Sequence, residues 1–478
     1  DYGRKDTEAQ PESDNQKLNL KREVGIIGAV SFIAGTMMGS GIFISPQYVL
    51  STIGSPGASL IVWACCGFIA MLGGLCYAEL GTVIPESGGE YIYMLRTAGK
   101  VVAFMFVFSF IIVMRPASAT GIALSFAEYV VAPFYEGCIP PQLVVKCVAA
   151  GGIMMLAIVN CLSVRLATSI QVMSMVVKVL AMAVIALGGV VMLFQGNTQN
   201  FDNSFDGTNV GVSSIGIAFY QGLWSYDGWN TLNYLTEELK HPEVNLPRAV
   251  VIAISLVTGL YLLVNVSYLT VMTPKELMSS SAVAVTWGNK VLGSWGWIMS
   301  VAAALSAFGS LNGTFFSGGR VCFVAAREGH MPDILSMAHV RRLTPSPALI
   351  FTTIVSLVVL IPGDFQSIVN FFSFTAWFFY AITLSGLLYL KIKKPELPRP
   401  YRVPIILPIL VLIAAIFLVL APIIDNPQIE YLYVTLFIFS GIIIYIPFIH
   451  YKLCPSLLTK LTVFLQLFLE VAPAEKNL

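Results

Sequence analysis

Long apolar runs follow one another along almost the whole chain, and short polar segments separate them. Residues 101–114, 172–194 and 405–424 are three examples. Apolar runs of about 18 or more residues with few charges are typical of membrane-spanning helices. The pattern therefore predicts an all-α polytopic membrane protein with about 12 transmembrane helices. The spans are centred near residues 38, 70, 112, 152, 180, 224, 260, 308, 353, 378, 412 and 440.

The composition excludes most soluble classes of protein. Only 11% of the 478 residues are charged and 56% are hydrophobic, whereas soluble domains carry about 25% charged residues. The net charge of +1 offers no attraction for nucleic acid, so we expect contacts with membrane lipid and no nucleic-acid partner. The eight cysteines include no Cys-x-x-Cys pair, and we therefore expect no metal and no cofactor.

The basic residues predict the orientation. Most of the 27 lysines and arginines fall in segments that share one side of the membrane, whereas Lys146, Lys275 and Lys290 fall on the other side. Because cytosolic loops carry the excess of positive charge, both termini are expected in the cytosol. The expected domains are a disordered cytosolic tail at 1–24, a transmembrane transport domain at 25–452, and a cytosolic interfacial helix and tail at 453–478.

Two spans carry an interruption at mid-membrane. Gly39, Ser40 and Gly41 interrupt the first span, and the polar stretch Trp224-Ser225-Tyr226-Asp227-Gly228-Trp229-Asn230 interrupts the sixth. Glycine in a helix costs about 1 kcal/mol relative to alanine, and irregular backbone at this depth is tolerated only where it lines a cavity or is buried. Breaks that lie five spans apart predict two inverted repeats, at about 25–195 and 211–390, followed by two extra helices. Such paired breaks mark the binding site of a transporter.

The ends of the broken helices suit the two charges of an amino-acid head group. Free N–H groups near Ile42 lie at the positive end of a helix dipole and favour a carboxylate. Free carbonyls near Met37, Trp224 and Asp227 favour an ammonium. The two breaks therefore predict a site for α-amino acids.

Three charged residues fall inside spans, where they are functional candidates. We expect Asp227 to bind the distal cation of lysine or arginine, and a carboxylate that caps a helix fragment is the alternative. We expect Lys178, deep in the fifth span, to bridge spans 1 and 5, and a snorkelling lysine is the alternative. Arg115 lies in the third span, where we expect a structural or gating charge.

Three motifs resemble the light subunits of heteromeric amino-acid transporters, which belong to the amino acid–polyamine–organocation (APC) superfamily with the LeuT-type fold. They are Gly39-Ser40-Gly41-Ile42-Phe43, Tyr226-Asp227-Gly228-Trp229-Asn230 and Thr236-Glu237-Glu238. Asp227 and the stretch 195–203 are most similar to the b-zero-plus type. That resemblance implies sodium-independent exchange of cystine and cationic amino acids for neutral ones. A large-neutral or a cystine/glutamate-type exchanger of the same family is the alternative.

The resemblance also implies roles for single residues. Lys178 stands where sodium-coupled relatives hold an ion. Tyr380 matches a pocket residue of the family, although aromatic packing is the ordinary role of such a side chain. Arg115 and the proline after it are similar to a pattern in the cystine/glutamate exchanger, but that exchanger has a second arginine where this chain has Ala376. Ala117, another expected substrate contact, replaces the threonine of the b-zero-plus pattern.

Cys138 is the one cysteine that falls squarely in a predicted outer segment. That side of the membrane is oxidising, and an unpaired outer cysteine indicates intermolecular pairing, with a free thiol as the alternative. Its position resembles the family cysteine that bonds a single-span type II glycoprotein heavy chain. The resemblance therefore implies an rBAT-like partner and a plasma-membrane location, apical in epithelia.

A membrane-embedded enzyme and a channel are the competing classes. The four histidines fall in predicted cytosolic loops or at a span end, without cysteine or acid at metal spacing. No Gly-x-Ser-x-Gly motif occurs, so we expect no catalytic residues. A channel lines a continuous pore, and the sequence contains no ring motif.

Overall fold

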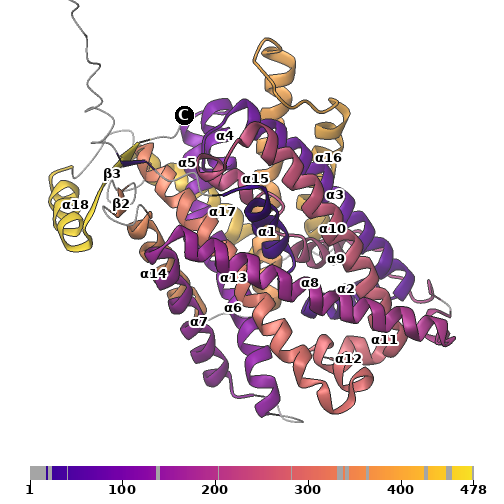
Figure 1. Ribbon diagram of the computed structural model, residues 1–478. Coiled ribbons are helices and arrows are strands. Elements are labelled where there is room, and N and C mark those ends of the chain that lie inside the picture. The colour runs from indigo at the N-terminus through magenta and orange to yellow at the C-terminus, as the bar shows by residue number, and fades with distance from the viewer. Residues whose placement is uncertain are drawn as a thin grey trace, which may run out of the picture.

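Helices account for nearly all of the regular structure in the computed structural model (Figure 1). The structure describes residues 18–19, 24–39, 41–135, 140–202, 204–280, 282–330, 337–339, 344–361, 365–424, 429–447 and 455–475. The α-helices are α1 (Ile26–Met37), α2 (Gly41–Ile53), α3 (Pro56–Val83), α4 (Glu90–Thr97), α5 (Lys100–Ser109), α6 (Arg115–Val131), α7 (Gln142–Leu162), α8 (Val164–Phe194), α9 (Val212–Ser225), α10 (Pro242–Val271), α11 (Pro274–Ser279), α12 (Val283–Val291), α13 (Trp297–Arg327), α14 (Ser346–Leu360), α15 (Phe365–Lys393), α16 (Ile406–Ile424), α17 (Ile429–Tyr445) and α18 (Pro455–Leu469).

Shorter elements connect or extend these helices. The π-helical turn η2 joins α5 to α6, and the 3-10 helix η5 follows α9. The short elements are η2 (Phe110–Met114), η3 (Ala132–Phe134), η4 (Gln199–Phe201), η5 (Thr231–Glu238), η6 (Gly293–Trp295) and the strands β1 (Leu18–Asn19), β2 (Met337–His339) and β3 (Val471–Glu475).

Nine helical stretches in the described part of the chain are long and apolar enough to cross a membrane. They are α1 with α2, α3, α5 with α6, α7, α8, α10, α13, α15 and α16. The other three predicted spans coincide with α9, α14 and α17, which are shorter than 18 residues. Helix α9 is short because it ends at the second break. The prediction of a polytopic membrane protein is confirmed.

Helix α8 shows how the sequence divides each span between lipid and protein. Met173, Leu180 and Leu187 recur every seven residues and are more than half exposed, whereas Gln171 and Lys178 on the opposite face are fully buried. Seven residues are close to two helical turns, so each set forms one stripe. Polar residues inside and apolar residues outside are the arrangement expected of a helix surrounded by lipid.

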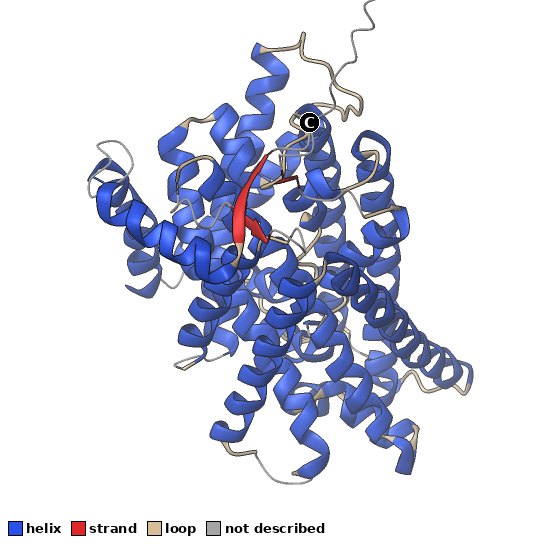
Figure 2. Cartoon of the chain, turned by 60° about the vertical axis from the view of Figure 1, so that its left-hand side comes forward, coloured by secondary structure: helices blue, strands red, loops and turns tan. Residues whose placement is uncertain are grey.

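A three-stranded sheet, in the order β1-β3-β2, lies on the surface of the helical bundle (Figure 2). Strand β1 pairs in parallel with β3 through Leu18 and Ala474, and β2 pairs antiparallel with β3 through Ala338 and Ala472. The all-α prediction did not include this sheet. Strand β1 falls within the tail 1–24 that was expected to be disordered, and pairing with β3 gives it a defined structure.

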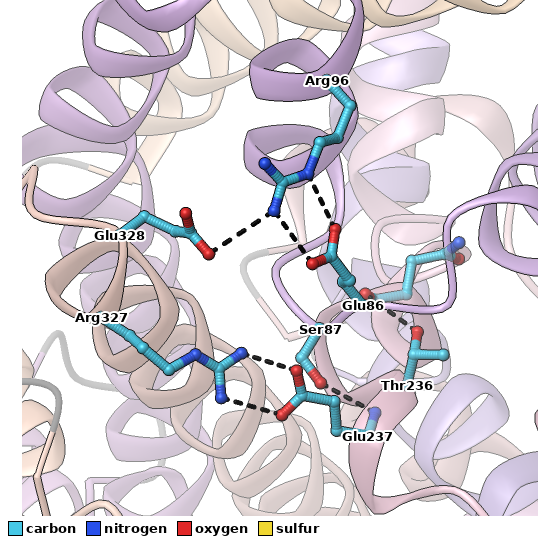
Figure 3. A network of polar contacts seen from close by, with 8 residues as sticks. Glu86, Ser87, Arg96, Thr236, Glu237, Arg327 and Glu328 are labelled. Carbon is cyan, nitrogen blue, oxygen red and sulfur yellow. Dashed lines mark hydrogen bonds and ion pairs between the residues drawn. The ribbon is translucent and has the colours of Figure 1, made fainter. Parts of the chain in front are cut away.

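Arginine–glutamate pairs fix the end of the sixth span to α13 (Figure 3). Arg327 donates two hydrogen bonds to the Glu237 carboxylate, at 2.6 and 3.0 Å. Arg320 donates to Glu238 at 2.9 Å, and both of these side chains are 1% exposed. Both acids lie in η5 and both arginines lie in α13. The segment after the second break is therefore held by two buried ion pairs.

Candidate functional site

The two predicted breaks are present and lie against each other. Helix α1 ends at Met37 and α2 begins at Gly41, while α9 ends at Ser225 and η5 begins at Thr231. The Tyr261 hydroxyl of α10 shares its one proton between the backbone carbonyls of Met37 and Ser225, and it lies 2.6 Å from the Ser225 oxygen. These are free carbonyls at the ends of the two fragments. One side chain thus ties both breaks together.

Gly228 explains why the second break approaches the first so closely. Its φ is +108°, a conformation that favours glycine. A Cβ at this position would also lie 2.7 Å from the Thr36 side chain and 3.3 Å from the Met37 nitrogen. Glycine therefore meets two demands here, one from its own backbone and one from the neighbouring fragment.

A small cavity lies between the breaks and is lined by Thr36, Met37, Gly39, Gly41, Ile122, Trp224, Asp227 and Ser310. Its volume is about 10 Å³, close to the smallest space that holds one water. An amino acid needs far more room, so the fragments must move apart to admit one. The Thr36 hydroxyl is buried and has no hydrogen-bond partner among the described residues. It is thus available to a bound head group.

Asp227 faces an internal cation across the break. The Nη2 atom of Arg115 lies 3.9 Å from Oδ2 of Asp227, and the two side chains are 5% and 14% exposed. The π-helical turn η2 ends directly before Arg115. Proline at position 116 has no N–H for the carbonyl four residues earlier, which widens the helix at this point. The Arg115 guanidinium also lies over the rings of Phe110 and Phe372, at 4.9 and 5.6 Å.

Other expected substrate contacts lie behind the cavity. Trp229 packs against Tyr77 and Tyr380, with ring centroids 4.7 and 5.1 Å apart. Asn230 donates to a carboxylate oxygen of Glu90 and, at 3.2 Å, to the Tyr234 hydroxyl. Ala117 is buried in α6 and is also not among the lining residues. In this conformation these residues pack behind the residues that line the cavity and do not line it themselves.

Lys178 connects the fifth span to the first. Its side chain is fully buried, and its ammonium donates to the Gly35 carbonyl, two residues before the end of α1. A Cβ on Gly309 of α13 would lie 2.9 Å from the same ammonium nitrogen. Lys178 therefore lies where α1, α8 and α13 meet, and its nitrogen is too deep for snorkelling.

Two predicted residues, Ser40 and Cys138, lie outside the residues that the structure describes. Within the described ranges, no group of three or more histidine, cysteine, aspartate or glutamate side chains could hold a metal ion.

Sequence reasoning missed four residues at the breaks. Tyr261, Thr36 and Ser310 are polar residues within apolar spans that also carry other polar residues, and Glu90 lies in the short helix α4. Ser310 donates to the Thr36 carbonyl at 2.7 Å. A polar side chain at mid-span depth was the available signal for Thr36 and Ser310, whereas a tyrosine within an apolar helix is too common to serve as one. Nothing in the sequence connects α4 to the second break.

Comparison with known proteins extends over almost the whole chain. The amino acid permease family matches residues 24–448. The b(0,+)-type amino acid transporter 1 of Homo sapiens is 50% identical over 99% of this chain and 98% of its own length. The human large neutral amino acids transporter small subunit 2 is 42% identical over 88% of this chain and 80% of its own length. The cystine/glutamate transporter of Pongo abelii is 40% identical over 97% of this chain and 93% of its own length.

Proposed function

This chain belongs to the amino acid permease family, and on that premise we propose that it is a sodium-independent exchanger. It takes up cystine and cationic amino acids and releases neutral amino acids. The chain is an amino acid transporter and not an enzyme, as the sequence predicted. Relatives of the b(0,+) type, which are 49–51% identical over 99% of the chain, support this choice of substrates.

The position of Asp227 carries the proposal. It is the one charged residue among the described residues that line the cavity. Backbone groups at the breaks, from Met37 to Gly41 and near Ser225, serve the head group that all amino acids share. A carboxylate in addition to that backbone suits a substrate whose side chain ends in a cation.

The finer architecture that we propose is a LeuT-type fold with twelve spans. Corresponding elements of the two halves pack in pairs, namely α2 with α9, α3 with α10, α6 with α13 and α7 with α14. A twofold axis in the membrane plane would produce this pairing. The nine long stretches are completed by α9 with η5, α14 and α17. Helix α18, with Phe464, Leu467 and Phe468 exposed, would lie at the cytosolic interface.

A cystine/glutamate-type exchanger fits the site less well. Such a site needs free positive charge for an anionic side chain. Arg115 is a buried cation beside the cavity residue Asp227, and its charge is opposed by that carboxylate at 3.9 Å. Ala376 supplies no second cation from α15.

Transport into proteoliposomes tests the proposed function. Labelled arginine, cystine and leucine are offered to vesicles with and without internal amino acid. We expect internal leucine to accelerate arginine uptake, and replacement of sodium by choline to leave the initial rates unchanged, because the Lys178 ammonium already bonds to the first span. An uptake rate that is the same with and without internal amino acid would indicate a channel. A sodium requirement would remove the proposed role of Lys178.

The proposal includes a partner chain at the plasma membrane. Cys138 would form a disulfide with a single-span type II glycoprotein heavy chain of the rBAT-like kind, and the pair would reside in the apical membrane of epithelial cells. The oxidising environment of the outer side supports this use of an unpaired cysteine.

A further inference from the structure

Two buried polar atoms of opposite charge type lack a partner beside the second break. The Nε atom of Arg115 and the Oε2 atom of Glu90 form no hydrogen bond with any described residue. The Arg115 side chain is 5% exposed, and Glu90 is fully buried. A buried charged group without a hydrogen-bond partner destabilises the folded protein more than a neutral group does. A hydrogen bond from the Arg115 Nε–H group to an acceptor, or to the Glu90 Oε2 atom from a donor, would therefore be favourable.

A short chain of contacts connects the two groups. The Arg115 guanidinium lies over the Phe110 ring, which packs against the Tyr234 ring at 5.6 Å. The Tyr234 hydroxyl accepts a hydrogen bond from Asn230, which also donates to Glu90. Arg115 and Glu90 are close enough to interact electrostatically. Arg115 therefore lies between two acids in this chain of contacts: Asp227, at 3.9 Å, and Glu90, which it reaches through Phe110, Tyr234 and Asn230.

The contact between Arg115 and Asp227 is loose. A distance of 3.9 Å is longer than a hydrogen bond between charged groups, which is about 2.7–2.9 Å. A substrate with a distal cation would compete with Arg115 for the same carboxylate. Two cations at one carboxylate repel each other, so such a substrate binds well only if Arg115 can pair elsewhere.

We propose that Glu90 is the alternative partner of Arg115. When the distal cation of a lysine or arginine substrate binds Asp227, the Arg115 guanidinium turns to Glu90, and with a neutral substrate it stays with Asp227. This inference rests on the proposed function, since it assumes that cationic substrates bind Asp227. Glu90 is then a positioning residue that determines specificity without touching the substrate.

The proposal predicts a pH dependence that only cationic substrates show. Burial raises the pKa of Glu90 to about 7, although hydrogen bonds from Tyr234 and Asn230 and the charge of Arg115 oppose the rise. Below this pKa Glu90 is neutral and cannot receive the guanidinium. The affinity for arginine should therefore fall as the pH falls through about 7, while the affinity for leucine stays level. The titratable groups that face Glu90 are Arg115 and the tyrosines Tyr77, Tyr93, Tyr234 and Tyr380.

The test measures the transport KM for arginine and leucine between about pH 6 and pH 8, in proteoliposomes of the full chain. Glu90→Gln should raise the arginine KM about tenfold, equivalent to about 1.4 kcal/mol, change the leucine KM little, and abolish the pH dependence. Arg115→Gln should also abolish the pH dependence, because no guanidinium then needs a second partner. Glu86→Gln is the matched control, since that nearby acid pairs with the half-exposed Arg96 and should behave like the wild type.

The outcomes separate this inference from the proposed function. If Asp227→Asn selectively impairs arginine while Glu90→Gln behaves like Glu86→Gln, the inference is overturned and the proposed function stands. If Asp227→Asn impairs arginine and leucine equally, the proposed function and the inference both fail. If Glu90→Gln cannot be reconstituted, the pH dependence of the wild-type arginine KM tests the inference instead. An arginine KM that is constant from about pH 6 to pH 8 would contradict a switch at Glu90.

Discussion

At the scale of single residues, Asp227 is placed to distinguish substrates that the rest of the cavity treats alike. The helix ends at Met37 and Gly41 offer backbone groups to the head group, which does not vary among amino acids. Trp224 and Ile122 contribute apolar surface. Under the proposed function, discrimination between lysine and leucine comes from a charge, and Asp227 is the charged residue among the described residues that line the cavity.

Asp227→Asn keeps the shape of the side chain and removes its charge. Loss of one partner of a desolvated charge pair costs about 2–5 kcal/mol, and each 1.4 kcal/mol is about a factor of ten. We expect arginine and lysine uptake to fall by one to several orders of magnitude and leucine uptake to fall far less. Initial rates normalised to the amount of protein at the surface provide the measurement. An equal fall for all substrates would make Asp227 a structural or gating residue.

The residues at the site were predictable in part. Asp227, Lys178 and Arg115 stand out in the sequence because charges are rare within spans. Tyr261 and Glu90 do not stand out, because a buried tyrosine is common in apolar helices and Glu90 belongs to a connecting helix. Their contacts depend on how α10 and α4 pack against the breaks, and residue spacing within one helix carries no information about that packing.

At the scale of elements, helix α10 connects the ends of α1 and α9 through the hydroxyl of Tyr261. Tyr261 satisfies carbonyls from both fragments. Met37 and Ser225 are both 1% exposed, so the loss of the hydroxyl removes a partner from two buried carbonyls. The existence of both breaks was predictable from glycine and polar residues at mid-span, but the tyrosine that joins them was not.

Tyr261→Phe should destabilise the protein by about 0.5–1.5 kcal/mol for each hydrogen bond lost. Thermal unfolding in detergent provides the measurement, and the midpoint should fall. Tyr268→Phe is the control, because that hydroxyl lies two turns further along α10, is also buried, and has no hydrogen-bond partner among the described residues. Equal midpoints for the two variants would show that the Tyr261 bonds add nothing to stability.

At the scale of the whole molecule, the ion pairs near the end of the sixth span differ sharply in burial. Arg327 and Glu237 are 9% and 1% exposed, whereas Arg96 and Glu86 are 40% and 15% exposed. A buried pair that loses one partner leaves an uncompensated charge, at a cost of about 3–5 kcal/mol. An exposed pair contributes about 0–1 kcal/mol.

Arg327→Ala should therefore lower the unfolding midpoint much more than Arg96→Ala does. Both substitutions remove the same side chain and both original pairs are bidentate. Arg96 also lies 3.7 Å from Glu328, and a larger effect at Arg327 would therefore appear despite this additional acidic partner of Arg96. Added salt should weaken the Arg96 contribution and leave the Arg327 contribution nearly unchanged. A larger effect at Arg96 would contradict this assignment.

The proposed assembly with a heavy chain is tested at Cys138. In cells that produce both chains, Cys138→Ser should abolish the high-mass band on non-reducing gels. Cys147→Ser is the control, because that thiol is exposed and lies within helix α7. A band that survives Cys138→Ser unchanged would exclude this disulfide.

The arrangement of spans followed from apolar patterning, but the small sheet did not. Its strands contain two to five residues, too few for a pattern of alternating apolar residues. They also come from three distant parts of the chain, so only the folded bundle brings them together. Short segments of this kind acquire strand structure from their partners.

The pairing of Leu18 with Ala474 makes the molecule nearly circular. Strands β1 and β3 are neighbours about 4.8 Å apart, so a short linker could join β3 to β1 without disturbing the bundle. New ends could then be opened in an outer loop, and a fluorescent label or an affinity tag placed there would face the medium. Such a circular permutant would carry every span in its original place while its ends lie on the opposite side of the membrane.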